Sequence, residues 1–244
     1  MNWKKYHRLR VIYAYIDDLE RDYPAICTVT VIGKSVEGRD IKVNKLYIVP
    51  VLNPDGYEYT HTKDRMWRKN RACYGGQCVG VDLNRNFSYG WGHNGEEGSS
   101  NEPSNVFFRG PAPFSEPEAA AVRDTILGSS STFKVFLSFH SYYELIIFPW
   151  GFKQDPCPNY LNLLEVGSTK DMTYFACGTS TDWSYGIAKI PYSYMIELRS
   201  RRHRFRLPKD QIIVTCLEIW NGVKSLMEFS LHGLEPLSPP GHDS

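Results

Sequence analysis

Residues 133–150 read FKVFLSFHSYYELIIFPW, and this stretch decides the fold class. It holds two apolar runs, 133–139 and a second ending at Trp150, which predict two strands. A third apolar run, YSYMIEL, lies at 192–198. Strands that are apolar along their whole length are buried on both faces, and here they alternate with helical patterns. We therefore expect an α/β fold with a mixed, largely parallel central sheet and helices on both faces.

Three helices are predicted around these strands. Apolar residues recur at helical spacing over residues 6–23, and residues 211–231 predict a closing helix. A further helix is expected over 116–128. Ser115 followed by Glu118 has the spacing of a capping box, which begins a helix.

Three further strands are expected in the N-terminal part. Residues 27–32 and 41–46 predict two strands around a glycine-containing turn. The apolar run 47–52 predicts a third, which abuts the second and ends at the turn signal NPDG of residues 53–56. Residues 88–113 are rich in Gly, Ser, Asn and Pro and predict one long irregular loop.

The composition excludes several classes of protein. The 244 residues include 28 basic and 27 acidic ones, with a formal net charge of +1, whereas nucleic-acid binders usually carry a basic excess. An aromatic content of 14% is too high for a disordered chain. No apolar run approaches the roughly 20 residues that span a bilayer. The basic N-terminus is not followed by the apolar region of a signal peptide. We expect a monomer with no nucleic-acid and no membrane partner.

The six cysteines fit neither a dense disulfide framework nor a zinc-finger spacing. Cys73 and Cys78 are close enough to bridge across the intervening glycines. Asn86 begins the glycosylation motif Asn-Phe-Ser, which matters only in a secreted chain. Together these features favour an extracellular ancestry without fixing the compartment.

Three short patterns look functional, but chance explains them better. Residues 90–95 match GxGxxG, yet no helix pattern follows and Trp91 would obstruct a bound pyrophosphate. His93 and His232 each precede a Glu by three residues, and His61 precedes an Asp in the same way. Such pairs are expected by chance among 7 His and 27 acidic residues.

Polar residues near strand ends are more informative, because α/β proteins bind ligands there. His140 follows the first strand. Glu197 lies inside an apolar strand, where a carboxylate is costly unless it is paired, coordinated or used. A structural histidine, and an ion pair of Glu197 with Arg199, remain open as alternatives. The arginines of 65–71 and the segment DLNRN at 82–86 supply groups suited to carboxylates and polarised carbonyl oxygens. Together these groups would suit hydrolysis of a substrate that carries a carboxylate.

Six stretches of the sequence carry a resemblance to a known family. They are NPDGYEYTHTKDRMWRKNR (53–71), GVDLNRNF (80–87), SFHSYYELIIFPWG (138–151), TSTDWSYG (179–186), IELR (196–199) and LPKDQI (207–212). Together they resemble the zinc carboxypeptidases of the A/B type, peptidase family M14. The similarity runs in order from about Tyr6 to Phe229, and no single motif carries it. It implies a carboxypeptidase-like fold, a Zn2+ cofactor, peptide or protein C-termini as partners, and secretion.

The resemblance also assigns roles in the reaction. His140 matches the third zinc ligand, and Glu197 the general base that takes a proton from zinc-bound water and passes it to the leaving amine. Arg68 matches the group that stabilises the carbonyl oxygen as it becomes negative. The remaining matches bind substrate: Asn84 and Arg85 hold the terminal carboxylate, Tyr174 is a mobile lid, Ser141 and Tyr142 line a subsite, and Thr181 sets side-chain preference. A small neutral Thr181 argues against a strict preference for Lys or Arg.

The sequence departs from the family pattern in one decisive place. The first two zinc ligands of the family stand in an HxxE motif between the strands that match 41–46 and 47–52, and here those strands abut. Roughly fifty residues of the pattern, with a strand and a helix, are absent there, and a second shortening lies within 158–174. The signal peptide and pro-segment of the family are also absent. We expect a catalytic-type domain over 1–231, truncated near 46/47, and a flexible tail over 232–244.

Three functional hypotheses follow. The first is a metallocarboxypeptidase that removes C-terminal residues of peptides, present here as an incomplete chain with two of three zinc ligands missing. Zinc on one imidazole would be weak, because catalytic zinc takes three protein ligands, and His93 or His61 would have to substitute. The second is a non-catalytic module that binds peptide C-termini. The third is polyanion binding by residues 199–206, with a solvated loop as the plainer interpretation.

Overall fold

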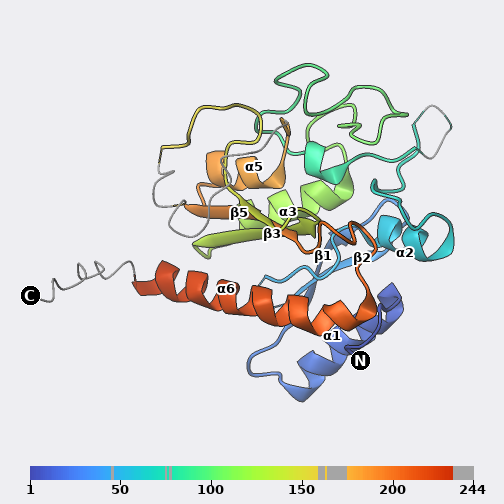
Figure 1. Cartoon of the computed structure of the whole chain (residues 1–244), viewed down its shortest axis with the longest axis vertical. Helices are drawn as coiled ribbons and strands as arrows, with labels where there is room; N and C mark the ends of the chain where they lie inside the picture. The colour runs from blue at the N-terminus through green and yellow to red at the C-terminus, as the bar shows by residue number, and fades with distance from the viewer. Residues whose placement is uncertain (45–46, 75, 77–78, 159–162, 164–174, 233–244) are drawn as a thin grey trace, which may run out of the picture.

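The computed structural model describes residues 1–44, 47–74, 76, 79–158, 163 and 175–232 (Figure 1). Its helices and strands alternate along the chain, which confirms the expected α/β class. In order they are α1 (Leu9–Asp22), β1 (Val29–Lys34), β2 (Asp40–Asn44), α2 (Pro54–Thr62), the 3-10 helix η1 (Leu83–Arg85), α3 (Pro117–Gly128), β3 (Val135–Ser141), β4 (Leu145–Ile147), α5 (Ser180–Gly186), β5 (Tyr192–Leu198), the 3-10 helix η2 (Lys209–Gln211) and α6 (Ile212–His232). No helix in these ranges is long and apolar enough to cross a membrane.

The described strands form two separate sheets. One holds β1 and β2 as an antiparallel pair, and the other has the strand order β3-β5-β4. Within the second sheet β5 is parallel to β3 and antiparallel to β4. The sheet is mixed, as expected, with seven parallel residue pairs and three antiparallel ones. Only three residues join β3 to β4, so the chain reverses there and β4 runs opposite to β3 and to β5.

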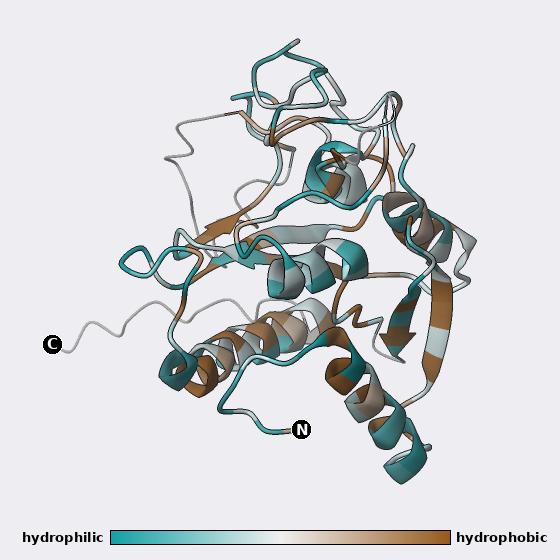
Figure 2. Cartoon of the chain, turned by 90° about the vertical axis from the view of Figure 1, so that its right-hand side faces the viewer, coloured by the Kyte–Doolittle hydropathy of each residue, from teal (hydrophilic) through white to brown (hydrophobic). Residues whose placement is uncertain are grey.

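Both faces of β3 and β5 are covered by helices. Phe136 packs against a core cluster that includes Ala119 of α3 and Trp183 of α5. The next residue, Leu137, packs in a second cluster with Leu226 of α6. This alternation follows from the period of two along a strand. In Figures 1 and 2, α6 and α1 lie below the sheet, and hydrophobic residues recur along α6.

The hairpin of β1 and β2 packs on α3 through a close approach at Gly33. A Cβ built at this position would lie 2.8 Å from the Cβ of Ala121. Real Cβ atoms do not come this close, so the strand touches the helix only because residue 33 has no side chain. Ala121 itself is buried in α3.

The expected strand at 47–52 does not form. The chain turns directly after β2, where the Tyr47 amide donates to the carbonyl of Asn44 at 2.6 Å. The Ile48 amide donates to the side-chain oxygen of Asn44 at 3.2 Å. Tyr47 takes a left-handed conformation with φ of 53°. Beyond this turn residues 47–52 form no ladder with a described strand, and the chain continues to the N-cap of α2.

The turn signal at 53–56 is instead the start of a helix. Asn53 is the N-cap of α2, and its side-chain oxygen accepts a hydrogen bond from the Gly56 amide at 2.9 Å. Pro54 occupies the first turn, where its missing N–H costs nothing. The residues of the expected turn therefore begin α2. The sequence-based predictions included neither α2 nor α5.

The expected capping box before α3 is wrong, although the helix itself is confirmed. Its N-cap is Glu116, with no side-chain cap. The Ser115 hydroxyl accepts from the side-chain amide of Asn86 at 2.9 Å and donates to the Glu116 carboxylate at 2.8 Å. Glu118 is fully buried, and its carboxylate accepts a hydrogen bond from the side-chain amide of Asn70 at 3.2 Å. Tertiary partners therefore satisfy both side chains that would have formed the box.

We predict that Gly33→Ala lowers the unfolding free energy by about 1–3 kcal/mol, because the new methyl group collides with Ala121. Urea denaturation measures the effect. Gly128→Ala is the matched control, since nothing lies within 4 Å of a Cβ at that helix end.

In an Ala121→Gly background the same Gly33→Ala change is expected to cost little, because the colliding Cβ is gone. A cost that stays the same in both backgrounds would show that the methyl group meets something other than Ala121.

Candidate functional site

The parallel pairing of β3 and β5 places His140 beside Glu197. The two residues are register partners, and Ser138 pairs with Met195 one step earlier on the same face. His140 lies inside β3, which extends to Ser141, and not after the strand as the sequence predicts. Adjacent residues of a parallel ladder share a face, so the imidazole and the carboxylate point to the same side of the sheet.

The short helix η1 delivers two polar groups to this face. Asp82 is its N-cap, and the Asp82 carboxylate accepts a hydrogen bond from the backbone N–H of Asn84 at 3.2 Å. Arg85 is buried, with Nε donating to the carbonyl of Gly98 at 2.7 Å and Nη1 to that of Asn84 at 2.8 Å. These contacts fix the guanidinium group in one orientation.

Asn84 links η1 to both neighbouring elements. Its side-chain oxygen accepts from the Ser180 amide at 3.0 Å and from the Ser180 hydroxyl at 3.1 Å. Its amide nitrogen donates to the thioether sulfur of Met195 at 3.6 Å. Thioether sulfur is a weak acceptor, so the Asn84 amide keeps most of its capacity to donate to a ligand.

A buried carboxylate stands between two arginines at this site. Arg68 Nε donates to Asp82 at 2.8 Å, and the Arg68 and Arg85 guanidinium groups both lie over the ring of Phe107, at 5.4 and 5.3 Å. Burial by itself would raise the pKa of Asp82, but the two arginines outweigh it and hold that pKa below its ordinary value. Asp82 therefore stays charged and holds the arginines in place.

Glu197 brings an unsatisfied acceptor to the same region. Its side chain is buried, and Oε2 has no hydrogen-bond partner. Burial raises the pKa of Glu197, while Arg68, the Tyr143 backbone amide and Arg85 act in the opposite direction. The hydroxyl oxygen of Thr181 is likewise buried without a partner. An orphaned buried acceptor is expensive, so both atoms point to a ligand that supplies the missing hydrogen bonds.

His140 is neutral at ordinary pH. Its Nε2 lies 2.8 Å from the Ser138 hydroxyl oxygen. Burial, and then the charge of Arg68, lower the pKa of His140 to about 4. A neutral imidazole is the form that binds metals. The ring is nevertheless already engaged with Ser138, and the charges around it are the positive Arg68 and Arg85 and the negative Asp82.

The described residues do not fit a catalytic zinc ion. Across the ranges that the structure covers, no group of three His, Cys, Asp or Glu side chains could hold a metal. The two substitutes considered from the sequence lie elsewhere, His93 against Phe152 and His61 against Tyr57. Since zinc enzymes use three protein ligands, His140 alone does not make the site.

The remaining predicted residues are only partly brought to this site. Ser141 is exposed at the end of β3, and Tyr142 contacts the ring of Phe205 at 4.7 Å. Thr181 is buried at the start of α5. Tyr174 lies outside the described residues.

Two acidic residues of the site were missed by the sequence analysis, Asp82 and Asp182. Asp182 is buried in α5 and accepts from the Gly151 amide at 3.0 and 3.1 Å. Burial raises the pKa of Asp182 to about 7. Asp182 stands among polar residues in STDWSYG, so it lacks the signal that marks Glu197 inside its apolar strand.

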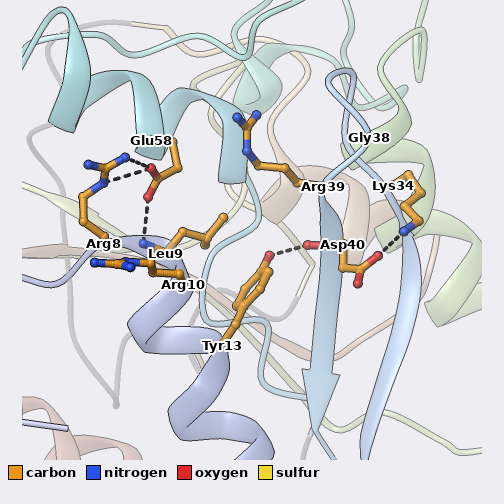
Figure 3. A pocket seen from close by; sticks show the side chains of 9 residues that line it. All are labelled: Arg8, Leu9, Arg10, Tyr13, Lys34, Gly38, Arg39, Asp40 and Glu58. Atoms are coloured by element: carbon orange, nitrogen blue, oxygen red, sulfur yellow. Dashed lines mark hydrogen bonds and ion pairs between the residues drawn. The ribbon is translucent and has the colours of Figure 1, made fainter.

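A groove of about 440 Å³ outside this site is a poor candidate (Figure 3). It lies between α1, α2 and the β1–β2 hairpin and is rich in cationic side chains. Its charges are largely paired internally, Arg8 with Glu58 and Lys34 with Asp40. The acidic residues therefore already occupy the cations that an anionic ligand would need.

The structure also bears on the expected disulfide and on the glycosylation motif. Cys73 is disulfide-bonded, as the spacing suggested, while its expected partner Cys78 lies outside the described residues. Asn86 is fully buried, and its side-chain nitrogen donates to the carbonyls of Arg109 and Ala112. Its glycosylation motif is therefore not an accessible acceptor.

We predict a pH-dependent difference in stability between the wild-type chain and Asp182→Asn. The folded pKa of about 7 lies above the ordinary value of about 3.9, so folding favours the protonated carboxyl group. This contribution to stability is present below about pH 4 and declines as the pH rises towards 7. Urea denaturation from pH 4.5 to 8 should show the wild type losing stability relative to the variant up to pH 7. A constant difference would contradict the raised pKa.

Comparison with known proteins gives the same fold. The family model described as zinc carboxypeptidase matches residues 12–47 and 44–222, two pieces that meet at one point of the chain. Carboxypeptidase B of Astacus astacus is 34% identical over 300 aligned positions, which cover 94% of this chain and 98% of the relative. Carboxypeptidase A5 of Macaca fascicularis is 36% identical over 212 positions, and the match spans 79% of this chain and 48% of that one.

A solved structure extends the similarity to three dimensions. Bovine thrombin-activatable fibrinolysis inhibitor, in complex with tick carboxypeptidase inhibitor, superposes with a TM-score of 0.88 at 29% identity, covering 95% of this chain and 99% of the other. Sequence and structure therefore agree over nearly the whole chain. The chain belongs to the zinc carboxypeptidase family, peptidase family M14.

Proposed function

We propose that this chain binds peptides by their C-terminal carboxylate, held by Arg68, Asn84 and Arg85. The observation that carries this proposal is the fixed placement of two arginines around the buried Asp82, with the side-chain amide of Asn84 held next to them by Ser180 and Met195. Arginine forks and amide groups are the donors that carboxylates prefer. Every peptide with a free C-terminus carries this terminal carboxylate.

The orphaned acceptors complete the proposed binding site. Glu197 Oε2 and the Thr181 hydroxyl oxygen are both buried without a partner. A peptide offers backbone N–H groups next to its terminal carboxylate, and these can donate to both atoms. Thr181 is small and neutral, so we propose that the pocket near it takes C-terminal residues with uncharged side chains. We further propose that Ser141 and Tyr142 line a subsite and that Tyr174 closes over the ligand.

Removal of the C-terminal residue is the second candidate function, and family membership favours it. Under this proposal Glu197 is the general base, Arg68 stabilises the carbonyl oxygen, and His140 is one zinc ligand. The described donors do not fit zinc, so we derive no step through the metal.

Alignment lengths support our proposal that a family segment is missing near 46/47. The family model matches in two pieces that meet at residues 44–47. The crayfish alignment has 300 positions, whereas 94% of 244 residues is about 229, so about 70 positions have no residue of this chain opposite them. A missing HxxE segment would remove two zinc ligands and leave the carboxylate site intact.

Two further proposals concern the compartment and the oligomeric state. The disulfide at Cys73 fits an oxidising compartment and hence secretion, as in the sequence-based hypothesis. We propose that the chain acts as a monomer on peptide or protein C-termini.

We predict that a peptide with a free C-terminus binds at least tenfold more tightly than its C-terminal amide. Arg68→Gln should weaken binding of the free peptide by about 10- to 100-fold, since a hydrogen bond between charged groups is lost. Titration calorimetry measures both effects. Arg123→Gln, which removes a half-buried arginine paired with its neighbour Asp124, is the matched control. Equal affinity for acid and amide would overturn the proposal.

We predict that Zn2+ changes neither the thermal unfolding midpoint nor peptide affinity. Only one of the expected ligands, His140, is present in the described chain, and one imidazole holds zinc weakly. Differential scanning fluorimetry with and without zinc, with His140→Ala as control, measures this. A midpoint that zinc raises in the wild type but not in the variant, together with release of the C-terminal residue, would instead establish the second candidate.

A further inference from the structure

The loop that follows β5 concentrates positive charge on a chain that is nearly neutral overall. Residues 199–206 read RSRRHRFR, five arginines in eight positions, whereas the whole chain has a net charge of +1. Arg202, Arg204 and Arg206 are exposed, and no ion pair with a described acidic residue satisfies them. Three cations without a local counter-charge attract anionic groups from solution.

The loop is held in place at several points. Arg199 pairs with Glu218 of α6 at 3.2 Å. Arg201 Nε donates to the carbonyl of Tyr143 at 2.9 Å, and the Arg204 amide donates to the carbonyl of Ser200 at 2.8 Å. These contacts use two of the five arginines for anchoring. The side chains of the other three, Arg202, Arg204 and Arg206, are exposed.

The same loop adjoins the carboxylate-binding site. The Phe205 ring packs edge-on against the Tyr142 ring, with centroids 4.7 Å apart. Tyr143, which accepts from Arg201, gives its own backbone amide to Glu197. The loop therefore begins one residue after β5 and returns to the side chains around Glu197.

A second basic segment reaches the loop from the other side of the site. Arg65 donates to the carbonyl of Phe205 at 2.6 Å, three residues before Arg68. The Tyr6 hydroxyl donates to the carbonyl of Leu207 at 2.9 Å and closes the loop's far end. Positive charge thus continues from the proposed carboxylate site outward along the loop.

We propose that residues 199–206 bind acidic side chains of the peptide upstream of its C-terminal residue, so that this chain prefers peptides with acidic C-terminal regions. The inference rests on the proposed function, because it extends the same bound peptide. An extended peptide advances about 3.3 Å per residue, so five residues reach about 17 Å from the anchored carboxylate. An acidic peptide is the favoured occupant because the loop touches Tyr142 and Tyr143 of the site itself.

The test uses two fluorescent peptides of equal length with free C-termini, one with three Glu and one with three Gln among the five residues before the last. Fluorescence anisotropy measures their affinity for the whole chain. We expect the Glu peptide to bind about tenfold more tightly at low salt, and the difference to shrink at 0.5 M salt, since exposed charges are screened. Equal affinities at low salt would overturn the inference.

The variant Arg202→Gln/Arg204→Gln/Arg206→Gln should abolish the preference and leave affinity for the Gln peptide unchanged. The matched control is Arg10→Gln/Lys134→Gln/Lys224→Gln, which removes the same charge from exposed positions elsewhere. It should keep the preference. An equal loss in both variants would mean that overall charge decides and would overturn the assignment to this loop.

Two further arms separate this inference from the proposed function. Amidated Gln peptide tests the carboxylate site alone, and equal binding of acid and amide would contradict the proposed function whatever the loop does. A preference for Glu over Gln that survives in the loop variant would contradict only the loop. Binding of a sulfated polysaccharide that the loop variant loses, with no preference among peptides, would replace the acidic peptide as occupant.

Discussion

The in-register parallel pairing of β3 and β5 is the constraint on which the rest of the structure depends. Seven consecutive residue pairs join the strands, from Val135 with Tyr192 to Ser141 with Leu198. One face of this ladder carries the core under α6, and the other carries His140 and Glu197 beneath η1 and α5. A shift of one residue would exchange the two faces, so the register fixes core and site together.

Electrostatics on the polar face follow from burial. Asp82, Arg68 and Arg85 form a charged group that is stable in the protein interior because each charge has a neighbour of opposite sign. Glu197 lacks such a direct partner at Oε2, and its pKa is raised accordingly. Under the proposed function this difference gives the two carboxylates different tasks, since Asp82 positions the arginines and Glu197 meets the bound peptide.

Away from this site, the fold leaves apolar residues exposed. The sheet is divided in two among the described strands, and the chain turns directly after β2. Exposed apolar residues gather along α6, at Ile213, Val214, Leu217, Trp220, Met227 and Leu231. A helix apolar on both sides is usually covered on both sides. This exposure agrees with the proposal that a segment common in the family is missing from this chain.

By itself, the sequence determined the α/β class, both bounds of β5, the bounds of α1, α3 and α6 to within a few residues, and the family, because these rest on local periodicity and on motifs in order. Which residues meet was decided only by the tertiary structure. Nothing in the local sequence shows whether NPDG forms a turn or caps α2, or whether the Ser115 side chain caps a helix or binds other side chains. Nor does it show whether Asn86 is an exposed glycosylation acceptor or a buried residue. The role of Asp82 likewise depends on Arg68, 14 residues away, and that of the loop at 199–206 on Tyr143, 58 residues from Arg201. Local sequence sets the preferences of each segment, and long-range burial and charge decide which preference is realised.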